Sequence, residues 1–310
     1  MKFRIRALAP SLVFLAFLAF TSSVGAQATI NFPNFCNTST FTLNGTAASL
    51  NPNAQCVLRL TNSTGQSGSA FLTNTFSLAS DASFSTFFSF QISNPVGIGD
   101  SDGAGADGIV FAVQTVSNTA GGAGGGIGYA GINPSVGVEF DTFNNSEPGG
   151  GNHIGIDLNG SVTSVVSLAI PGRFNDGAVW YAWVDYNGVT DLLEARVSNT
   201  PARPAAAAVS TTVNLPVVLG TTNAFVGFTS GTGAGGGTHE ILSWNLVGSF
   251  APIGGPTPTQ GPTLTPTAPA ATFTPVVSGP AAAVPTLSFP MLALLGMALA
   301  GAALLLIKRV

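Results

Sequence analysis

Charge is scarce in this chain of 310 residues, since only 7% of them are Asp, Glu, Lys or Arg. Lysine occurs only at Lys2 and Lys308, and residues 27–251 hold four arginines against all 13 acidic residues. Nucleic-acid binding depends on cations that neutralise phosphates. This acidic region therefore argues against a nucleic-acid partner and favours cations or neutral ligands.

Cysteine is also rare, because Cys36 and Cys56 are the only two. Residues 1–26 predict an export signal, since three basic residues precede the apolar run Leu12–Phe20 and a small-residue cleavage site at 24–26. In an oxidising compartment a lone pair of cysteines is expected to form a disulfide. The alternative is two unrelated buried thiols.

Long amphipathic helical patterns are missing, whereas 39 glycines and 22 phenylalanines accompany abundant Thr, Ser and Val. Phe84–Ile92 alternates apolar and small polar residues, as a half-buried strand does. Asn187-Gly188 between Val179–Tyr186 and Leu192–Val197 indicates a hairpin. With further candidate strands at Ala224–Thr229 and Glu240–Val247, residues 27–251 are predicted to form an all-β sandwich or barrel.

The C-terminal part changes composition. Residues 252–283, rich in Pro, Thr, Gly and Ala, predict an extended linker. Pro290–Ile307 is uncharged and precedes Lys308-Arg309, which predicts a transmembrane helix that leaves the β-domain outside. Residues 284–310 resemble the IPTL-type, PEP-CTERM-like sorting signals, with Val284 at the family's Ile position. That resemblance implies an exosortase-like processing enzyme and a protein that is either anchored at the cell surface or released.

Polar side chains concentrate in Val136–Asp157. In an extended strand, Val136, Val138 and Phe140 would share one face, while Glu139 and Asp141 would share the other. Further ligand-type residues follow within the loop, namely Asn145, Glu147 and His153. Several oxygen ligands suit calcium, and an added imidazole suits a neighbouring transition metal. The stretch predicts a metal-organised loop; the alternative is an ordinary polar loop with an unliganded histidine.

The same stretch resembles the metal loop of L-type (legume-like) lectins, which reads V-E-F-D-T-[FY]-x-N, then Asp-Pro, then H-I-G-I-D. Here the corresponding residues are Val138–Asn145 and His153–Asp157. Three more segments agree in order: Phe84–Phe90, Ala106–Phe111 and His239–Trp244. The resemblance spans nearly all of residues 27–250 and implies a concanavalin A-like antiparallel β-sandwich, or jelly roll.

The resemblance also implies two metal ions. Calcium would be held by Asp141, the Phe143 carbonyl, the Asn145 side chain and Glu147. A transition metal, usually manganese, would be held by Glu139, Asp141, Glu147 and His153. Glu147-Pro148 departs from the family's Asp-Pro, arrives early, and is followed by three glycines. The extra methylene of Glu147 either compensates for the shorter loop or weakens the transition-metal site.

Four residues are implied in sugar binding. Asp107, usually after a cis peptide bond from Ala106, would accept hydrogen bonds from two hydroxyls, and the Gly125 N–H and the Asn145 amide would donate. The Phe143 ring would pack on the apolar face of the sugar. Gly231–Gly237 would form the remaining wall and, being almost free of side chains, leave the pocket open. Taken alone, Asp107 is equally compatible with a turn and the glycine runs with flexible loops.

Three functions follow. The first is a non-catalytic, calcium-dependent lectin whose partners are glycans. The second is a glycoside hydrolase on the same fold, which needs paired carboxylates roughly 5 to 10 Å apart across a cleft, and no E-x-D-x-x-E motif is present. The third is a structural or adhesive surface module with a decayed sugar site. The sequence does not specify which sugar is bound or whether the protein forms a homo-oligomer.

Overall fold

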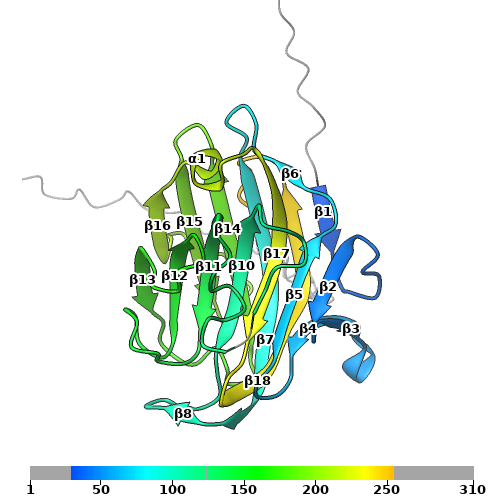
Figure 1. The fold of residues 1–310 in the computed structure, drawn as a ribbon, viewed down its shortest axis with the longest axis vertical. Helices are drawn as coiled ribbons and strands as arrows, with labels where there is room; N and C mark the ends of the chain where they lie inside the picture. Colours follow the sequence, from blue (N-terminus) through cyan, green and yellow to red (C-terminus); the bar gives the residue numbers. More distant parts are fainter. Residues whose placement is uncertain (1–28, 123, 255–310) are drawn as a thin grey trace, which may run out of the picture. The chain divides into compact units, whose positions relative to one another are not determined.

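A computed structural model describes residues 29–254 except residue 123 (Figure 1). The predicted export signal at 1–26, the sorting segment and transmembrane helix at 284–310, and linker residues 255–283 lie outside the described part. Within residues 29–254, no helix is both long enough and apolar enough to cross a membrane.

The domain consists of two antiparallel sheets stacked face to face (Figure 1). The first sheet has eight strands in the order β16-β15-β14-β7-β18-β4-β3, and β1 also pairs with β18. Its strands are β1 (Thr29–Phe32), β3 (Ala48–Leu50), β4 (Val57–Thr61), β7 (Phe84–Gly97), β14 (Val179–Asn187), β15 (Leu192–Ser198), β16 (Val209–Thr212) and β18 (Gly235–Val247). The predicted strands in Phe84–Ile92, Val179–Tyr186, Leu192–Val197 and Glu240–Val247 are confirmed.

The second sheet also has eight strands, in the order β13-β12-β11-β10-β17-β5-β2, with β6 paired to β17. Its strands are β2 (Phe41–Gly45), β5 (Ser67–Leu72), β6 (Phe76–Ser77), β10 (Gly108–Gln114), β11 (Ser135–Asp141), β12 (His153–Leu158), β13 (Val166–Ala169) and β17 (Asn223–Gly231). A separate two-stranded ribbon pairs β8 (Gly99–Asp100) with β9 (Gly103–Ala104). The helices are short: η1 (Pro52–Ala54) and α1 (Leu215–Leu219).

Alternation along the strands builds a core of aromatic and aliphatic side chains between the sheets. Phe88 of β7 is fully buried, and its ring centroid lies 5.6 Å from that of Phe140 on β11 and 5.0 Å from that of Phe228 on β17. Val138 and Phe140 are both in this core, as the alternation of Val136–Phe140 predicts. The opposite face of β11 is therefore free to carry Glu139 and Asp141.

The aromatic residues of Val179–Tyr186 divide between two faces. Trp180 and Tyr186 belong to the core, as does Trp244. Trp183 and Tyr181 lie on the outer face of the first sheet, where the Trp183 ring centroid is 5.3 Å from that of Phe87. Adjacent residues of a strand point to opposite faces, so only every second aromatic residue of this strand lies between the sheets, although Trp183 on the outer face is also fully buried.

Two local predictions can be compared with the structure. The disulfide between Cys36 and Cys56 is formed, with the Cα atoms 4.9 Å apart. The hairpin at Asn187-Gly188 is confirmed, but its connection is longer than a two-residue turn, because Asn187 pairs with Leu192. The Asn187 carboxamide oxygen accepts the N–H of Val189, which starts this longer turn.

A second, smaller core holds the connection between β10 and β11 against the outer face of the second sheet. Ile127, Tyr129 and Ile132 of this connection pack with three buried residues of the sheet, which are Phe71, Val110 and Ala112. This packing fixes the glycine-rich segment that includes Gly125 next to the ends of β10 and β11.

Candidate metal centre and ligand-binding site

Three predicted site residues lie side by side where neighbouring strands of the second sheet begin or end. Asp107 directly precedes β10, whose first residue, Gly108, pairs with Asp141 at the end of β11. Asp141 in turn pairs with His153 at the start of β12. Antiparallel pairing thus places residues from distant parts of the sequence in one row, and the loop of residues 142–152 projects from this row.

Glu139, Asp141 and His153 form a buried cluster in which one ligand-type atom from each residue lies within 4.8 Å of the others. Their exposed fractions are 0%, 2% and 0%. The His153 Nε2 atom lies 3.0 Å from Glu139 Oε1, while Glu139 Oε2 is buried without a hydrogen-bond partner. Two carboxylates and one imidazole in this geometry are a donor set for a divalent cation.

The surroundings of His153 support this interpretation. Its Nδ1 lies 2.8 Å from the Gly150 carbonyl, which can only accept, so Nδ1 carries the hydrogen. The neutral ring then directs the Nε2 lone pair towards a carboxylate oxygen, and this arrangement needs either a second proton or a cation. A metal-bound histidine commonly donates its other N–H to a backbone carbonyl in this way.

The pKa values show how costly the cluster is without a cation. Burial raises the pKa of Asp141 well above its usual range, and the charges of Glu139 and Glu147 raise it further. The hydrogen bond from the Phe143 N–H lowers this pKa, but by less than burial raises it. Burial lowers the pKa of His153, but the hydrogen bond and charge of Glu139 outweigh it, so the net pKa is raised. A divalent cation would relieve both the desolvation and the repulsion.

Glu147 is placed differently from the other predicted ligands. It is partly exposed and does not belong to the cluster of Glu139, Asp141 and His153. Its Oε1 accepts the backbone N–H of Asn145 at 3.1 Å. The loop therefore holds Glu147 close to Asn145, on the calcium side of the expected pair of sites.

The residues predicted to bind sugar converge beside this cluster. The peptide bond from Ala106 to Asp107 is cis. Asp107 is 3% exposed, and its Oδ2 atom is buried without a hydrogen-bond partner, so it is not a surface turn residue. Burial raises the pKa of Asp107 to about 6, although the Asn145 amide and the Gly233 N–H facing the carboxylate lower it. Asp107 thus keeps an acceptor free for an incoming donor.

Gly125 completes the group from the segment held by the second core. A Cβ atom at Gly125 would lie 3.0 Å from both Nδ2 and Oδ1 of Asn145, so any larger residue would displace the Asn145 side chain. Phe143 is half-buried, and its N–H donates to Asp141 Oδ1 at 2.7 Å. The structure therefore brings together all four residues that the resemblance implies for sugar binding.

Gly231–Gly237, expected as one loop that forms the remaining wall of the pocket, is a loop only in its middle. Gly231 ends β17 and Gly235 starts β18, so only residues 232–234 form the turn between them. Gly235 and Gly236 of β18 pair with Gly97 and Val96 of β7, and Gly237 lies at the register shift that follows. At Gly236, glycine allows the backbone of Ser63 to approach closely, because a Cβ there would lie 2.5 Å from the Ser63 carbonyl oxygen.

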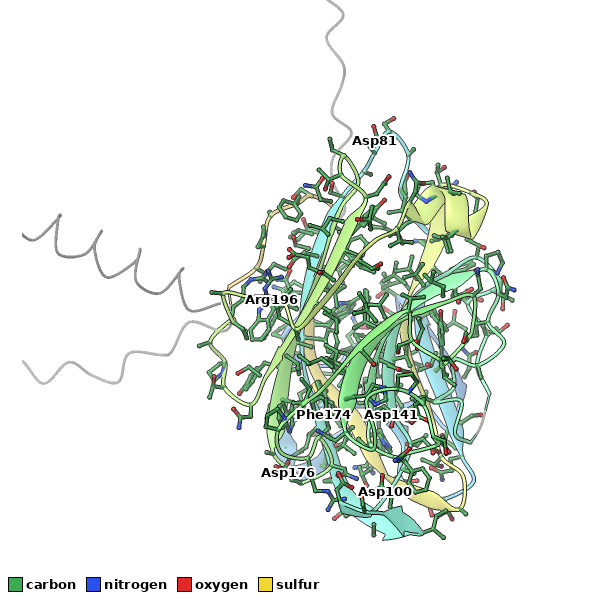
Figure 2. The ribbon with its side chains drawn as sticks, turned by 90° about the vertical axis from the view of Figure 1, so that its left-hand side faces the viewer. Asp81, Asp100, Asp141, Phe174, Asp176 and Arg196 are labelled. Atoms are coloured by element: carbon green, nitrogen blue, oxygen red, sulfur yellow. A yellow bond between two sulfur atoms is a disulfide. The ribbon has the colours of Figure 1, made fainter. Side chains whose placement is uncertain are left out.

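Asp157 and Asp100 were missed as parts of the site. The Ser164 hydroxyl lies between Glu139 and Asp157, and burial together with the Glu139 charge raises the pKa of Asp157 to about 10. Alternation along His153, Gly155 and Asp157 places all three on one face, and that signal was available in the sequence. Asp100, by contrast, comes from the β8–β9 ribbon (Figure 2) and contacts the loop through Asn144.

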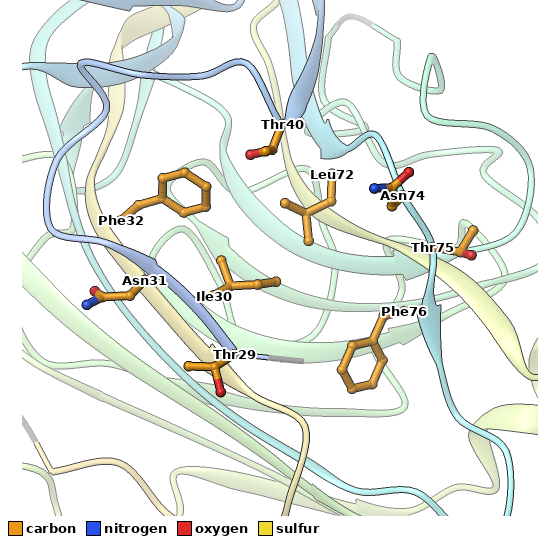
Figure 3. Close-up of a pocket in the computed structure, with 9 residues that line it drawn as sticks. All are labelled: Thr29, Ile30, Asn31, Phe32, Thr40, Leu72, Asn74, Thr75 and Phe76. Carbon is orange, nitrogen blue, oxygen red and sulfur yellow. The ribbon is translucent and has the colours of Figure 1, made fainter. Parts of the chain in front are cut away.

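Other polar and hollow features lie apart from this row. His239 is fully buried and its Nδ1 lies 2.7 Å from Thr61 Oγ1, while Glu240 pairs with Arg59, so this His-Glu pair has a structural role. A cavity of about 320 Å³ opens beside β1 (Figure 3). Its lining is neutral: Thr29, Ile30, Asn31, Phe32, Thr40, Leu72, Asn74, Thr75 and Phe76.

Comparison with known proteins agrees with this geometry. A model of the legume lectin domain matches residues 27–257. The chain belongs to the legume lectin family. This lectin-type domain is 36% identical over 183 residues to the basic agglutinin of Psophocarpus tetragonolobus, a match that covers 54% of this chain and 70% of the agglutinin. It is 33% identical over 178 residues to an L-type lectin-domain containing receptor kinase, VIII.1, of Arabidopsis thaliana, covering 54% of this chain but only 24% of the kinase.

Solved lectin structures confirm the two-sheet sandwich. The lectin from Bauhinia forficata in complex with GalNAc is 27% identical, with a TM-score of 0.59 over 72% of this chain and 98% of that lectin. The winged bean acidic lectin in complex with methyl-α-D-galactose is 27% identical, with a TM-score of 0.61, and the match covers 72% of this chain and 98% of that lectin. The chain thus shares the family and the two-sheet fold of these sugar-bound lectins.

Proposed function

We propose that this protein is a calcium-dependent lectin without catalytic activity, exported and then displayed at the cell surface or released. The observation that carries the proposal is the convergence of Asp107, Gly125 and Asn145 beside the buried Glu139, Asp141 and His153 cluster. The unpartnered Asp107 Oδ2 faces this junction. Export and display rest on residues 1–26 and 284–310 of the sequence alone.

Each residue has a distinct role in the proposed site. Asp107 accepts hydrogen bonds from two sugar hydroxyls, and the Gly125 N–H donates to a third oxygen. Asn145 would donate from its amide to the sugar, while its carbonyl oxygen would serve as a calcium ligand. Phe143 offers its ring to the apolar face of the pyranose. Because these contacts are short and directional, a shift of the loop by less than 1 Å would weaken all of them together.

Metal binding organises the same loop. Asp141, the Phe143 carbonyl, Asn145 and Glu147 would hold calcium, and Glu139, Asp141 and His153 would hold a transition metal such as manganese. Glu147 lies outside the cluster of Glu139, Asp141 and His153, so calcium is the metal on which the proposal depends. Bound calcium neutralises the carboxylates and fixes the loop that carries Asn145.

The competing functions differ in what they require. A glycoside hydrolase needs two solvent-accessible carboxylates across a cleft, whereas Glu139 and Asp141 are buried. A module with a decayed sugar site would bind metal and ignore sugars. The turn at residues 232–234 carries Thr232, which is buried, together with Gly233 and Ala234, so few side chains are available there to select a sugar.

Galactose and N-acetylgalactosamine are the first ligands to test, because structural neighbours hold them. A glycan array that includes both sugars should bind the protein in calcium and lose it in chelator. Asp107→Ala should abolish binding in calcium, since it removes both acceptor oxygens. Binding that survives chelator and Asp107→Ala would refute the proposal, and calcium binding without any sugar would favour the decayed module.

A further inference from the structure

The β8–β9 ribbon is fastened to the ligand-binding row along its backbone. Ile98 N donates to the Ala234 carbonyl at 3.2 Å, and Gly105 N donates to the Ile98 carbonyl at 3.1 Å. Ala234 is adjacent to Gly233, which faces Asp107, and Gly105 directly precedes the Ala106–Asp107 peptide bond. The ribbon is therefore a neighbour of the sugar-binding residues at both of its ends.

Asp100, at the end of β8, reaches from the ribbon into the metal loop. Its Oδ2 accepts the backbone N–H of Asn144 at 2.8 Å. A Cβ atom at Gly151 would overlap the same oxygen, so the other limb of the loop also packs on this carboxylate. One side chain thus contacts both limbs of the loop of residues 142–152, immediately before Asn145 and shortly before His153.

The ribbon itself is held from outside the loop. The Arg173 guanidinium donates to the Ala104 carbonyl at 2.9 Å and lies 3.6 Å from Asp102. Asp100 Oδ1 accepts the N–H of Asp102 at 3.1 Å, which orients the carboxylate. Asp100 is consequently presented on an element with its own anchors, as an external support for the loop needs.

We propose that Asp100 is a positioning residue that braces the calcium loop. The inference rests on the proposed calcium site and adds a residue to its support. The loop contains three consecutive glycines, Gly149 to Gly151, after an early Glu147-Pro148. Glycine loses more backbone freedom on ordering than any other residue, so this loop gains from a fixed partner. The Asp100 carboxylate supplies it by holding Asn144 and Gly151 together.

The test compares three variants of the full domain. Asp100→Ala removes both acceptor oxygens, Asp100→Asn keeps only one of the two, and Asp176→Ala removes a different aspartate that likewise accepts an N–H two residues ahead, from Ala178 at 2.7 Å. Calorimetric titration with calcium should show about tenfold weaker binding for Asp100→Ala. Asp176→Ala should stay within about twofold of the unmodified protein. Asp100→Asn should lie between Asp176→Ala and Asp100→Ala, because one carboxamide oxygen cannot accept from both Asp102 and Asn144.

A second readout needs no metal. In chelator, hydrogen exchange of the Asn144 amide should be about tenfold faster in Asp100→Ala and unchanged in Asp176→Ala. If the unmodified protein binds no calcium, the proposed function fails, and the exchange rate still decides the brace. Unchanged exchange in Asp100→Ala, or an equal loss of calcium affinity in Asp176→Ala, would overturn the inference, the latter because removal of any nearby acidic charge would then have the same effect.

Discussion

Replacement of Gly125 by alanine tests the sugar site through a single close contact. The new Cβ would lie 3.0 Å from Nδ2 and Oδ1 of Asn145 and 3.1 Å from its Cγ, whereas ordinary contacts are 3.4–4 Å. Asn145 must therefore move by a few tenths of an ångström from the position in which its amide would meet a sugar. Gly122→Ala is the matched control, since no atom lies within 4 Å of a Cβ there.

The expected loss follows from the hydrogen bonds involved. Misplacing the Asn145 amide and crowding the Gly125 N–H removes about 1.5 to 3 kcal/mol, which corresponds to roughly a ten- to hundredfold weaker affinity for the sugar. The assay is binding to immobilised galactose and N-acetylgalactosamine in saturating calcium, with unfolding midpoints measured in parallel. Full affinity in Gly125→Ala, or an equal loss in Gly122→Ala, would refute the assignment of Gly125.

Three further predictions concern stability. Phe88→Ala, in the centre of the aromatic core, should lower the free energy of unfolding by about 3 to 5 kcal/mol in urea denaturation, and a loss below about 1 kcal/mol would contradict the described packing. Replacing both Cys36 and Cys56 by serine should cost about 3 kcal/mol, because the disulfide spans 20 residues; an unchanged urea midpoint would show that it does not restrain the chain. In chelator, stability should fall as pH rises from about 4 to 8, because burial raises the pKa of Asp107 to about 6 and that of Asp157 to about 10, so the folded state binds more protons than the unfolded state. Thermal midpoints that rise over this pH range would contradict the predicted fall in stability. Added calcium should make stability depend less steeply on pH.

Much of the metal centre was predictable from local sequence, because strand alternation decides which residues share a face. Val138 and Phe140 enter the core, so Glu139 and Asp141 must face the other way. The same rule would have placed Asp157 beside Glu139 and Trp183 outside the core. These features depend on one strand and its neighbours, which is the range over which a periodic pattern is informative.

The rest depended on contacts between distant segments. Only the resemblance to lectins linked Asp107 and Gly125 to Asn145, since no local pattern pairs them. Asp100 contacts Asn144 across 44 residues, from a glycine-rich ribbon without a periodic pattern. The glycines of Gly235–Gly237 were interpreted as a loop, because glycine in sequence signals either mobility or close packing. Only the neighbouring backbone distinguishes the two.

The central claim is that sugar binding requires calcium at the loop that carries Asn145. Calorimetric titration of galactose or N-acetylgalactosamine into the same protein, first in calcium and then in chelator, tests it most directly. The account predicts one binding site per chain in calcium, no measurable heat in chelator, and recovery when calcium is restored. Equal affinity in calcium and in chelator would contradict it.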